Sequence, residues 1–346
     1  MGLNIREIIP KKEIEIEDLK GKTLCVDAFN SLYQFLSTIR QADGTPLMDD
    51  KKRITSHLSG ILYRNAALLE AGIKLVYVFD GKAPDLKAKT REKRDSIKAE
   101  AKEKYDEAKQ EEDLELMKRY SSMLVRINDE MLKESKELLI AMGICVVDAP
   151  SEGEAEAAYL CKTKPEVYSS VSQDYDSLLF GAKRLIQNLT LSRRRKTVSG
   201  FVEVKPLLID LEATFKELEI NQEQLICLGI LVGTDYNPKG IPGIGQKKAL
   251  QIVKEFKTPE KIFESVKERI EVLEEKNQFD WKEIYDLFVH HEVKDVDFVF
   301  PKLDKEKIKQ ILVNEHNFSE ERVEKQIERL EEIEKAKKQT GLNKWF

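Results

Sequence analysis

Short hydrophobic runs recur along the chain, and several of them close on an acidic residue. Residues 23–26 are followed by Asp27, and residues 74–79 are followed by Asp80. Runs this apolar are typical of strands in a parallel sheet that is covered on both faces. We expect strands at residues 23–27, 74–80, 143–148, 166–172, 183–189 and 201–204.

Helical patterns separate these runs. Residues 28–40 are expected to be helical, residues 54–70 have the period of an amphipathic helix, and residues 222–233 form an apolar helix. Alternation of strand and helix predicts an α/β fold with right-handed crossovers. The fold class predicted is therefore α/β, with a mixed or parallel sheet and helices on both faces.

Residues 82–119 interrupt this alternation. The segment consists almost entirely of Lys, Arg, Glu, Asp and Ala, which form helices well but leave too little apolar surface for a core. We expect a helical insertion that projects from the body. Basic residues three or four positions apart would line one face of it, and a solvated charged face is the default explanation. These residues are Lys87, Arg91, Arg94, Lys98 and Lys102.

Length, composition and cysteine content change this picture little. Among 346 residues, 41% are hydrophobic and 35% charged, which fits a folded protein of one to three domains. Four cysteines without metal-site spacing indicate free thiols in a reducing compartment. We find no signal peptide and no membrane-spanning run, so a cytoplasmic protein without membrane contact is expected.

The net charge of −5 first argues against a nucleic-acid partner. Of seven acids, however, six stand at junctions that end strands or begin helices, where ligands of α/β sheets gather, and the seventh follows a helix and a glycine, from where it could reach the same site. Residues two apart in extended chain point the same way, and helix starts favour anions. With these seven neutralised by metal, the balance is no longer negative and DNA is allowed. They are Asp27, Asp80, Glu152, Glu154, Asp174, Asp176 and Asp235.

Each acid alone has an ordinary explanation. Ser151 and Glu154 have the spacing of a capping box, and a strand-end aspartate such as Asp27 often caps the next helix. Seven acids together would repel one another, so divalent cations are the better explanation. Oxygen ligands without His or Cys favour Mg²⁺ or Mn²⁺. Two such ions about 4 Å apart support phosphodiester hydrolysis.

Five segments carry a resemblance to a known family. In order and spacing they resemble the motifs of the flap endonuclease 1 family, which are structure-specific 5′ nucleases of the XPG/Rad2 group, and the match runs along essentially the whole chain. The end at Phe346, without a long basic tail, resembles the archaeal form. The segments are residues 26–29, 76–82, 149–157, 172–181 and 233–237.

The resemblance implies a PIN-like core with a helical arch and a helix–two-turn–helix element. It implies a Mg²⁺-dependent 5′ flap endonuclease, with 5′–3′ exonuclease activity, that acts in Okazaki-fragment maturation and DNA repair. The expected partner is DNA with a 5′ flap, nick or gap, and the expected state is a monomer. Two Mg²⁺ ions, for which Mn²⁺ substitutes, would sit among the seven acids.

The resemblance also assigns DNA-facing residues. Lys87 and Arg94 would face the scissile phosphate beside the catalytic Asp176, and Tyr33, which the pattern alone places in the core, would stack on a base. A glycine-rich turn would open a helix that holds one duplex strand, aided by K⁺; without the resemblance it could be an ordinary turn. The other expected DNA contacts are Arg40, Arg64, Glu152, Gly233, Asp235, Gly243, Gly245, Lys247 and Lys248.

The last eight residues form a separate signal. They fit the pattern of sliding-clamp (PCNA) ligands, a glutamine followed by a hydrophobic residue and two aromatic residues. Such a segment can fill an apolar pocket on a partner with aromatic anchors. The anchoring residues would be Gln339, Leu342, Trp345 and Phe346.

The chain is expected to divide into five parts along its length. Two other functions stay open: a processive 5′–3′ exonuclease of the same superfamily, which would prefer nicked or recessed ends, and a non-catalytic clamp-bound DNA adaptor, whose DNA binding would survive EDTA. The parts are a nuclease region at 1–100, the rest of the arch at 101–130, a second nuclease region at 131–260, a helical part at 261–338 and the clamp-binding tail at 339–346.

Overall fold

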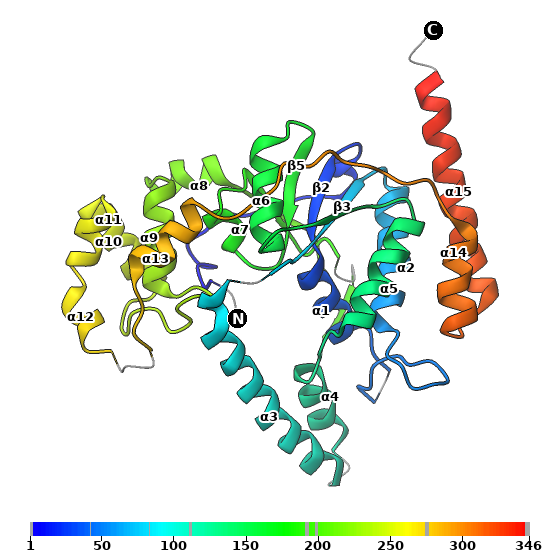
Figure 1. Cartoon of the computed structure of the whole chain (residues 1–346), viewed down its shortest axis with the longest axis horizontal. Coiled ribbons are helices and arrows are strands. Elements are labelled where there is room, and N and C mark those ends of the chain that lie inside the picture. The colour runs from blue at the N-terminus through cyan, green and yellow to red at the C-terminus, as the bar shows by residue number, and fades with distance from the viewer. Residues whose placement is uncertain are drawn as a thin grey trace.

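A seven-stranded mixed sheet forms the centre of the protein (Figure 1). The computed structural model describes residues 3–41, 43–82, 84–110, 113–190, 194–197, 200–273 and 277–342. The strand order is β1-β9-β6-β5-β2-β3-β4, in which β9 runs antiparallel to its neighbours β1 and β6 and the pairs from β6 to β4 are parallel. The strands are β1 (Lys12–Glu13), β2 (Thr23–Asp27), β3 (Lys74–Phe79), β4 (Cys145–Asp148), β5 (Val167–Val171), β6 (Arg184–Gln187) and β9 (Leu207–Asp210).

Helices cover both faces of the sheet, as the apolar strands predict. Alternate residues of β2 enter different cores: Leu24 and Val26 join one cluster of buried side chains, and Cys25 joins the other. Helices α1 (Ala28–Thr38), α2 (Ser56–Glu70) and α5 (Asp129–Ala141) supply the first core, and α6 (Gly153–Thr163), α7 (Asp176–Leu179), α8 (Leu211–Leu218) and α9 (Gln222–Val232) supply the second.

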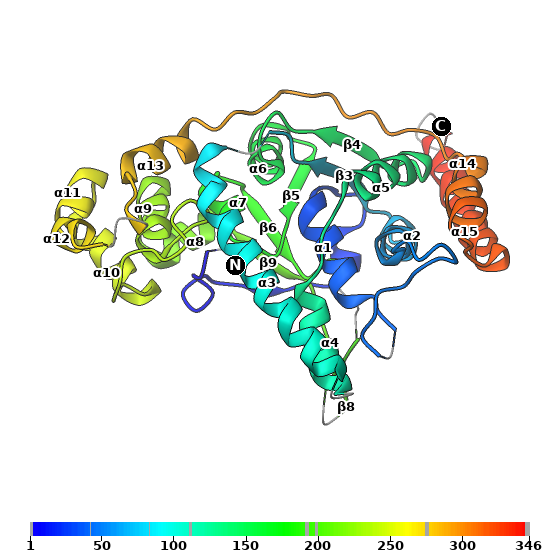
Figure 2. The ribbon, with the colours of Figure 1, turned by 60° about the horizontal axis from the view of Figure 1, so that its bottom comes forward.

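The charged insertion is helical and projects from the body. After the short turn η2 (Asp85–Lys87), helices α3 (Ala88–Gln110) and α4 (Leu114–Met123) lie side by side and extend away from the sheet (Figure 1). Figure 2 shows α3 crossing the face of the molecule on the side of α1 and α7. Among the residues that the structure describes, no helix is long enough and apolar enough to cross a bilayer.

The C-terminal helices occupy two opposite ends of the body. An extended segment, residues 290–304, crosses the molecule between them (Figure 2). The last helix, α15, lies against α2, and the short helix α14 lies against α5. The division of the chain into five parts stays a prediction. One end holds α10 (Gln246–Phe256), α11 (Pro259–Glu264), α12 (Lys267–Glu271) and α13 (Trp281–Val289), and the other holds α14 (Lys305–Lys309), the π-helical η4 (Gln310–Glu315) and α15 (Glu320–Leu342).

The predicted elements are wrong in two places. Residues 194–197, where no strand is predicted, form strand β7 (Arg194–Thr197), which pairs with β8 (Gly200–Glu203). Strands β1 and β9 were not expected, because β1 has two residues and the apolar run of β9 merges with that of α8 directly after it.

Candidate active site

Two of the seven acids meet where β2 and β3 end. Asp27 pairs with Val78 in the parallel register, so Asp27 and the residue after β3, Asp80, lie at the same edge. Asp27 Oδ1 accepts from the Asn30 amide at 3.1 Å, which confirms the expected helix cap. Asp80 Oδ1 accepts from the Gly153 amide at 2.6 Å, which ties it to the start of α6. Both carboxylates are therefore held by backbone.

Glu152 and Glu154 come from the start of α6, but not as a capping box. Glu152, not Ser151, is the N-cap residue, and its own side chain makes no capping hydrogen bond. The carboxylate of Glu154 instead accepts from Ser177, from its amide at 3.0 Å and its hydroxyl at 2.8 Å. The capping-box explanation is therefore wrong, because Glu154 reaches across to α7.

Asp174 and Asp176 lie in a bend, not in extended chain. Strand β5 ends at Val171 and Asp176 already begins α7, so the expected two-residue alternation does not apply. Asn30 holds the bend by donating to Asp174 Oδ2 at 3.2 Å. Asp176 is buried, and its Oδ1 has no hydrogen-bond partner among the residues described.

Three of the acids have raised pKa values, and the other four are among the charges that raise them. Burial, and next Asp80, raises the pKa of Asp27 to about 7. Burial and then Asp176, Asp174 and Asp27 raise the pKa of Glu154. Burial and then Asp235, Asp174 and Glu152 raise the pKa of Asp176, although Lys87 opposes this. The structure thus brings together the whole set that the sequence predicts: Asp27, Asp80, Glu152, Glu154, Asp174, Asp176 and Asp235.

Lys87 joins this cluster from the base of the arch. Its Nζ forms an ion pair with Glu152 and lies 3.7 Å from Asp235 Oδ2. Burial disfavours its charged form, but Glu152 and Asp235 outweigh burial and hold the pKa of Lys87 above its usual value. The ring of Tyr236 lies below the ammonium, with its centroid 5.6 Å away. A fixed positive charge therefore borders the acids.

The donor set suits hard divalent cations. All seven groups offer carboxylate oxygens, which Mg²⁺ and Mn²⁺ prefer. Asp176 Oδ1, which has no partner in the described part of the chain, and the raised pKa values of Asp27, Glu154 and Asp176 both indicate negative charge that these residues do not compensate. The residues present therefore fit a metal-binding role.

Known proteins match this chain along its length. Two family models match, the XPG N-terminal domain over residues 4–101 and the XPG I-region over residues 143–235. Flap endonuclease 1 of Thermococcus onnurineus is 51% identical over 349 residues, covering 100% of this chain and 99% of that protein. The same protein of Pyrococcus furiosus is 51% identical with equal coverage. The chain belongs to the flap endonuclease 1 family.

Solved structures agree with this assignment. A flap endonuclease-1 from Methanococcus jannaschii has 39% identity and a TM-score of 0.75, covering 97% of this chain and 100% of that one. The catalytic core of Rad2 in complex with DNA substrate, at 23% identity and a TM-score of 0.67, covers 95% and 100% and supports the fold alone. The predicted family and α/β fold are confirmed, and the chain is a structure-specific nuclease of a divalent-metal-dependent family.

The arch and α1 place an aromatic ring near the basic face. Tyr33 is 40% exposed, so the core position that the pattern alone suggests is wrong. Lys98 of α3 holds its ammonium 5.9 Å from the centre of that ring. Arg91 and Arg94 lie in α3, but their side chains fall outside the described residues.

Arg40 contacts the arch in this structure. Its guanidinium donates to the carbonyl of Ser121 at 3.2 Å and to that of Gly44 at 2.8 Å, so it ties α1 to α4. Arg64, on α2, is half-buried, and burial lowers its pKa. Contact of either residue with DNA stays a prediction.

The glycine-rich turn joins α9 to α10 as expected. Gly243 has a φ of +76°, a backbone conformation that favours glycine, and Gly245 is the N-cap of α10 with no heavy atom within 4 Å of where a Cβ would stand. Lys247 and Lys248 are exposed at the same helix start. The turn therefore presents open backbone and positive charge. Gly233, with a φ of +116°, ends α9 before Asp235.

The segment predicted to bind a sliding clamp lies partly outside the described residues. Gln339 and Leu342 are in the last turn of α15, and nothing is described of their side chains or of Trp345 and Phe346.

Three positioning residues were missed in the sequence. Tyr236 donates its hydroxyl to Glu152, Asn30 holds Asp174, and Ser177 holds Glu154. Each is one to three residues after a predicted acid, so the polar neighbours of Asp235, Asp27 and Asp176 were the available signal.

Proposed function

We propose that this chain cuts 5′ flaps in DNA at the single-strand/duplex junction, with Mg²⁺ as its cofactor and 5′–3′ exonuclease activity as an associated reaction. The observation that carries the proposal is the set of seven carboxylates gathered where the parallel strands end, with raised pKa values at Asp27, Glu154 and Asp176. Family membership supplies the reaction class, which is consistent with Okazaki-fragment maturation and repair.

The seven acids would hold the ions, with two Mg²⁺ expected and Mn²⁺ able to substitute. When bound, divalent ions activate a water and stabilise the leaving oxygen in phosphodiester hydrolysis. The protein contributes position: Asn30 and Ser177 fix Asp174 and Glu154, and the Gly153 amide fixes Asp80. Fixed carboxylates lose little entropy on binding an ion or substrate.

The basic groups would position DNA against these acids. Lys87 stands at the base of the arch beside Glu152. There the positive charge of the lysine would stabilise the negative charge that develops on the reacting phosphate. Tyr33 offers an exposed ring for base stacking. The turn around Gly243 and Gly245 would receive a duplex phosphate with K⁺ nearby, and Arg94, Arg40 and Arg64 would add contacts.

Metal removal tests this proposal. In EDTA the protein is expected to leave a 5′-labelled flap substrate uncut, and excess Mg²⁺ should restore cleavage because the acids keep their positions without metal. A duplex without a flap or nick is the matched substrate control. Equal cleavage with and without EDTA would refute the metal-dependent reaction.

Gly153→Ala should weaken the metal site. A Cβ there would stand 2.7 Å from Asp80 Oδ1 and 3.0 Å from the Val78 carbonyl, so Asp80 must shift. We expect Mn²⁺ affinity to fall by about tenfold, as for other changes that misplace a ligand. Titration followed by electron paramagnetic resonance measures this. Gly245→Ala, with open space around the Cβ, should bind Mn²⁺ like the unchanged protein. Equal affinities would contradict the role of Asp80.

The last eight residues would tether the enzyme, a cytoplasmic monomer on its own, to a sliding clamp. Deleting residues 339–346 is expected to abolish capture by immobilised clamp and to leave flap cleavage without clamp unchanged, because the segment begins in the last turn of α15, a helix that packs against α2 and holds none of the seven acids. A double substitution of Trp345 and Phe346 by alanine should reproduce the loss. Capture equal to that of the full chain would refute the tether.

A further inference from the structure

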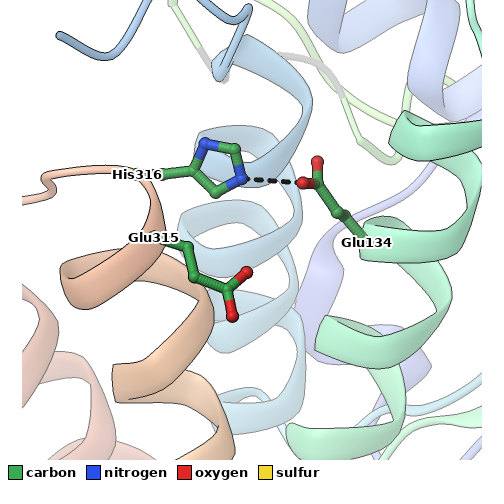
Figure 3. A group of neighbouring side chains, drawn as sticks. All are labelled: Glu134, Glu315 and His316. Atoms are coloured by element: carbon green, nitrogen blue, oxygen red, sulfur yellow. Dashed lines mark hydrogen bonds and ion pairs between the residues drawn. The ribbon is translucent and has the colours of Figure 1, made fainter. Parts of the chain in front are cut away.

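A second group of ionisable side chains lies where the C-terminal helices meet the body. Glu134 belongs to α5, Glu315 ends η4, and His316 follows it directly. Their possible ligand atoms all lie within 4.8 Å of one another (Figure 3). None of these residues belongs to the seven acids, so the group is separate from the nuclease site.

His316 is buried and oriented by carboxylates on both ring nitrogens. Only 2% of the residue is exposed. Nδ1 lies 3.0 Å from Asp49 Oδ2, and Nε2 lies 2.9 Å from Glu134 Oε1. Asp49 is fixed by Arg53, whose Nε donates to it at 2.8 Å. A carboxylate on one imidazole nitrogen that directs the other toward a ligand position is the usual support of a metal-binding histidine.

His57 gives an independent indication that this group of side chains binds an ion. It is 1% exposed, and its Nε2 faces the second oxygen of Glu134, Oε2, at 3.7 Å, beyond hydrogen-bond distance. Within the described part of the chain neither ring nitrogen of His57 has a hydrogen-bond partner. Buried polar groups nearly always have one, so a buried imidazole aimed at Glu134 without a bond needs an explanation.

A protonated His316 shared by Asp49 and Glu134 explains only part of this arrangement. It accounts for the two short contacts of His316 but leaves His57 unexplained. Burial lowers the pKa of His57, although Glu134 opposes this, and a lowered pKa favours the neutral ring. Neutral imidazole is the form that binds metal ions.

We propose that His57, Glu134, Glu315 and His316 form a structural binding site for a transition-metal ion of the Zn²⁺ class. Zn²⁺ binds imidazole nitrogen and carboxylate oxygen and takes four protein ligands in a closed site, whereas Mg²⁺ prefers oxygen ligands alone. The ligands come from α2, α5 and the end of η4, so the ion would fasten the C-terminal helices to the nuclease body.

Calorimetric titration with Zn²⁺ tests the site. The titration uses the full chain carrying Asp174→Asn and Asp176→Asn, in excess Mg²⁺. These two measures reduce binding of Zn²⁺ at the nuclease acids. We expect one Zn²⁺ per chain and a rise in the thermal unfolding midpoint. His316→Gln and Glu315→Gln should each weaken this binding by at least about tenfold, and Asp49→Asn, which removes the orienting carboxylate, by about tenfold.

His290→Gln is the matched control, since His290 lies on the far end of the body, after α13, with its ring exposed. It should leave the titration unchanged. Glu315 is only partly buried, so Glu315→Gln keeps the test valid if a histidine variant fails to fold. Absence of Zn²⁺ binding, or equal binding by Glu315→Gln and His290→Gln, would overturn the proposal and leave a protonated-histidine bridge only.

Discussion

Asp176→Asn is expected to reduce flap cleavage by roughly 10³-fold or more, since it removes a buried charge of the metal site. Asp176 is buried, its Oδ1 has no hydrogen-bond partner among the described residues, and Asp235, Asp174 and Glu152 act on it electrostatically. Single-turnover cleavage of a 5′-labelled flap in Mg²⁺ measures the effect.

Asp148→Asn is the matched control for this substitution. Asp148 also ends a strand of the same sheet, β4, but it is exposed and pairs with Lys136 at 2.6 Å. The Asp148→Asn variant should cut the flap at the unchanged rate. Asp176→Asn removes one of several repelling charges, so the thermal stability of that variant in EDTA should not fall. An active Asp176→Asn variant would remove this residue from the site.

Lys87→Ala is expected to slow the single-turnover rate by about 10²- to 10³-fold, the range for loss of one group that stabilises developing charge. The ammonium is fixed by Glu152 and Asp235, so it is positioned before DNA arrives. DNA affinity should change much less than the rate, because a single contact among many is lost. Rate and affinity are measured on the same flap substrate.

Lys102→Ala separates chemistry from arch charge. Lys102 lies farther along α3, is exposed, and pairs with Asp106 of its own helix at 3.1 Å. Its loss should alter DNA affinity slightly and leave the cleavage rate unchanged. If Lys87→Ala and Lys102→Ala behave alike, Lys87 acts only as part of the basic face.

The sequence predicted the acids better than their local geometry. Asp27 and Asp80 follow hydrophobic runs that could hardly be anything but buried strands, so their common edge followed from parallel pairing. Asp174 and Asp176 were expected in extended chain, but Ser172 accepts from the Asp174 amide at 3.2 Å and stabilises a bend. A serine here can accept a hydrogen bond from a nearby backbone amide and end the strand, or the strand can continue. Which of these occurs depends on tertiary contacts that the sequence does not show.

Tertiary contacts explain the other differences. Ser151 and Glu154 have capping-box spacing, but Ser177, which is distant in sequence, competes for the same carboxylate. The helical pattern of residues 305–333 indicates which side of these helices is apolar. It does not indicate that this side packs against α2 and α5. Residues 290–304 have no helical period, and only the fold shows that they carry the chain across the body.

Mapping the product of a 5′-labelled flap substrate tests the central claim most directly. With Mg²⁺, the account predicts one endonucleolytic product that ends at the single-strand/duplex junction, and no product with Asp176→Asn. A ladder of single nucleotides from recessed ends, with flaps no better than nicks, would indicate a processive exonuclease. Tight DNA binding in EDTA with no product under any metal would indicate a non-catalytic adaptor, and either result would contradict the account.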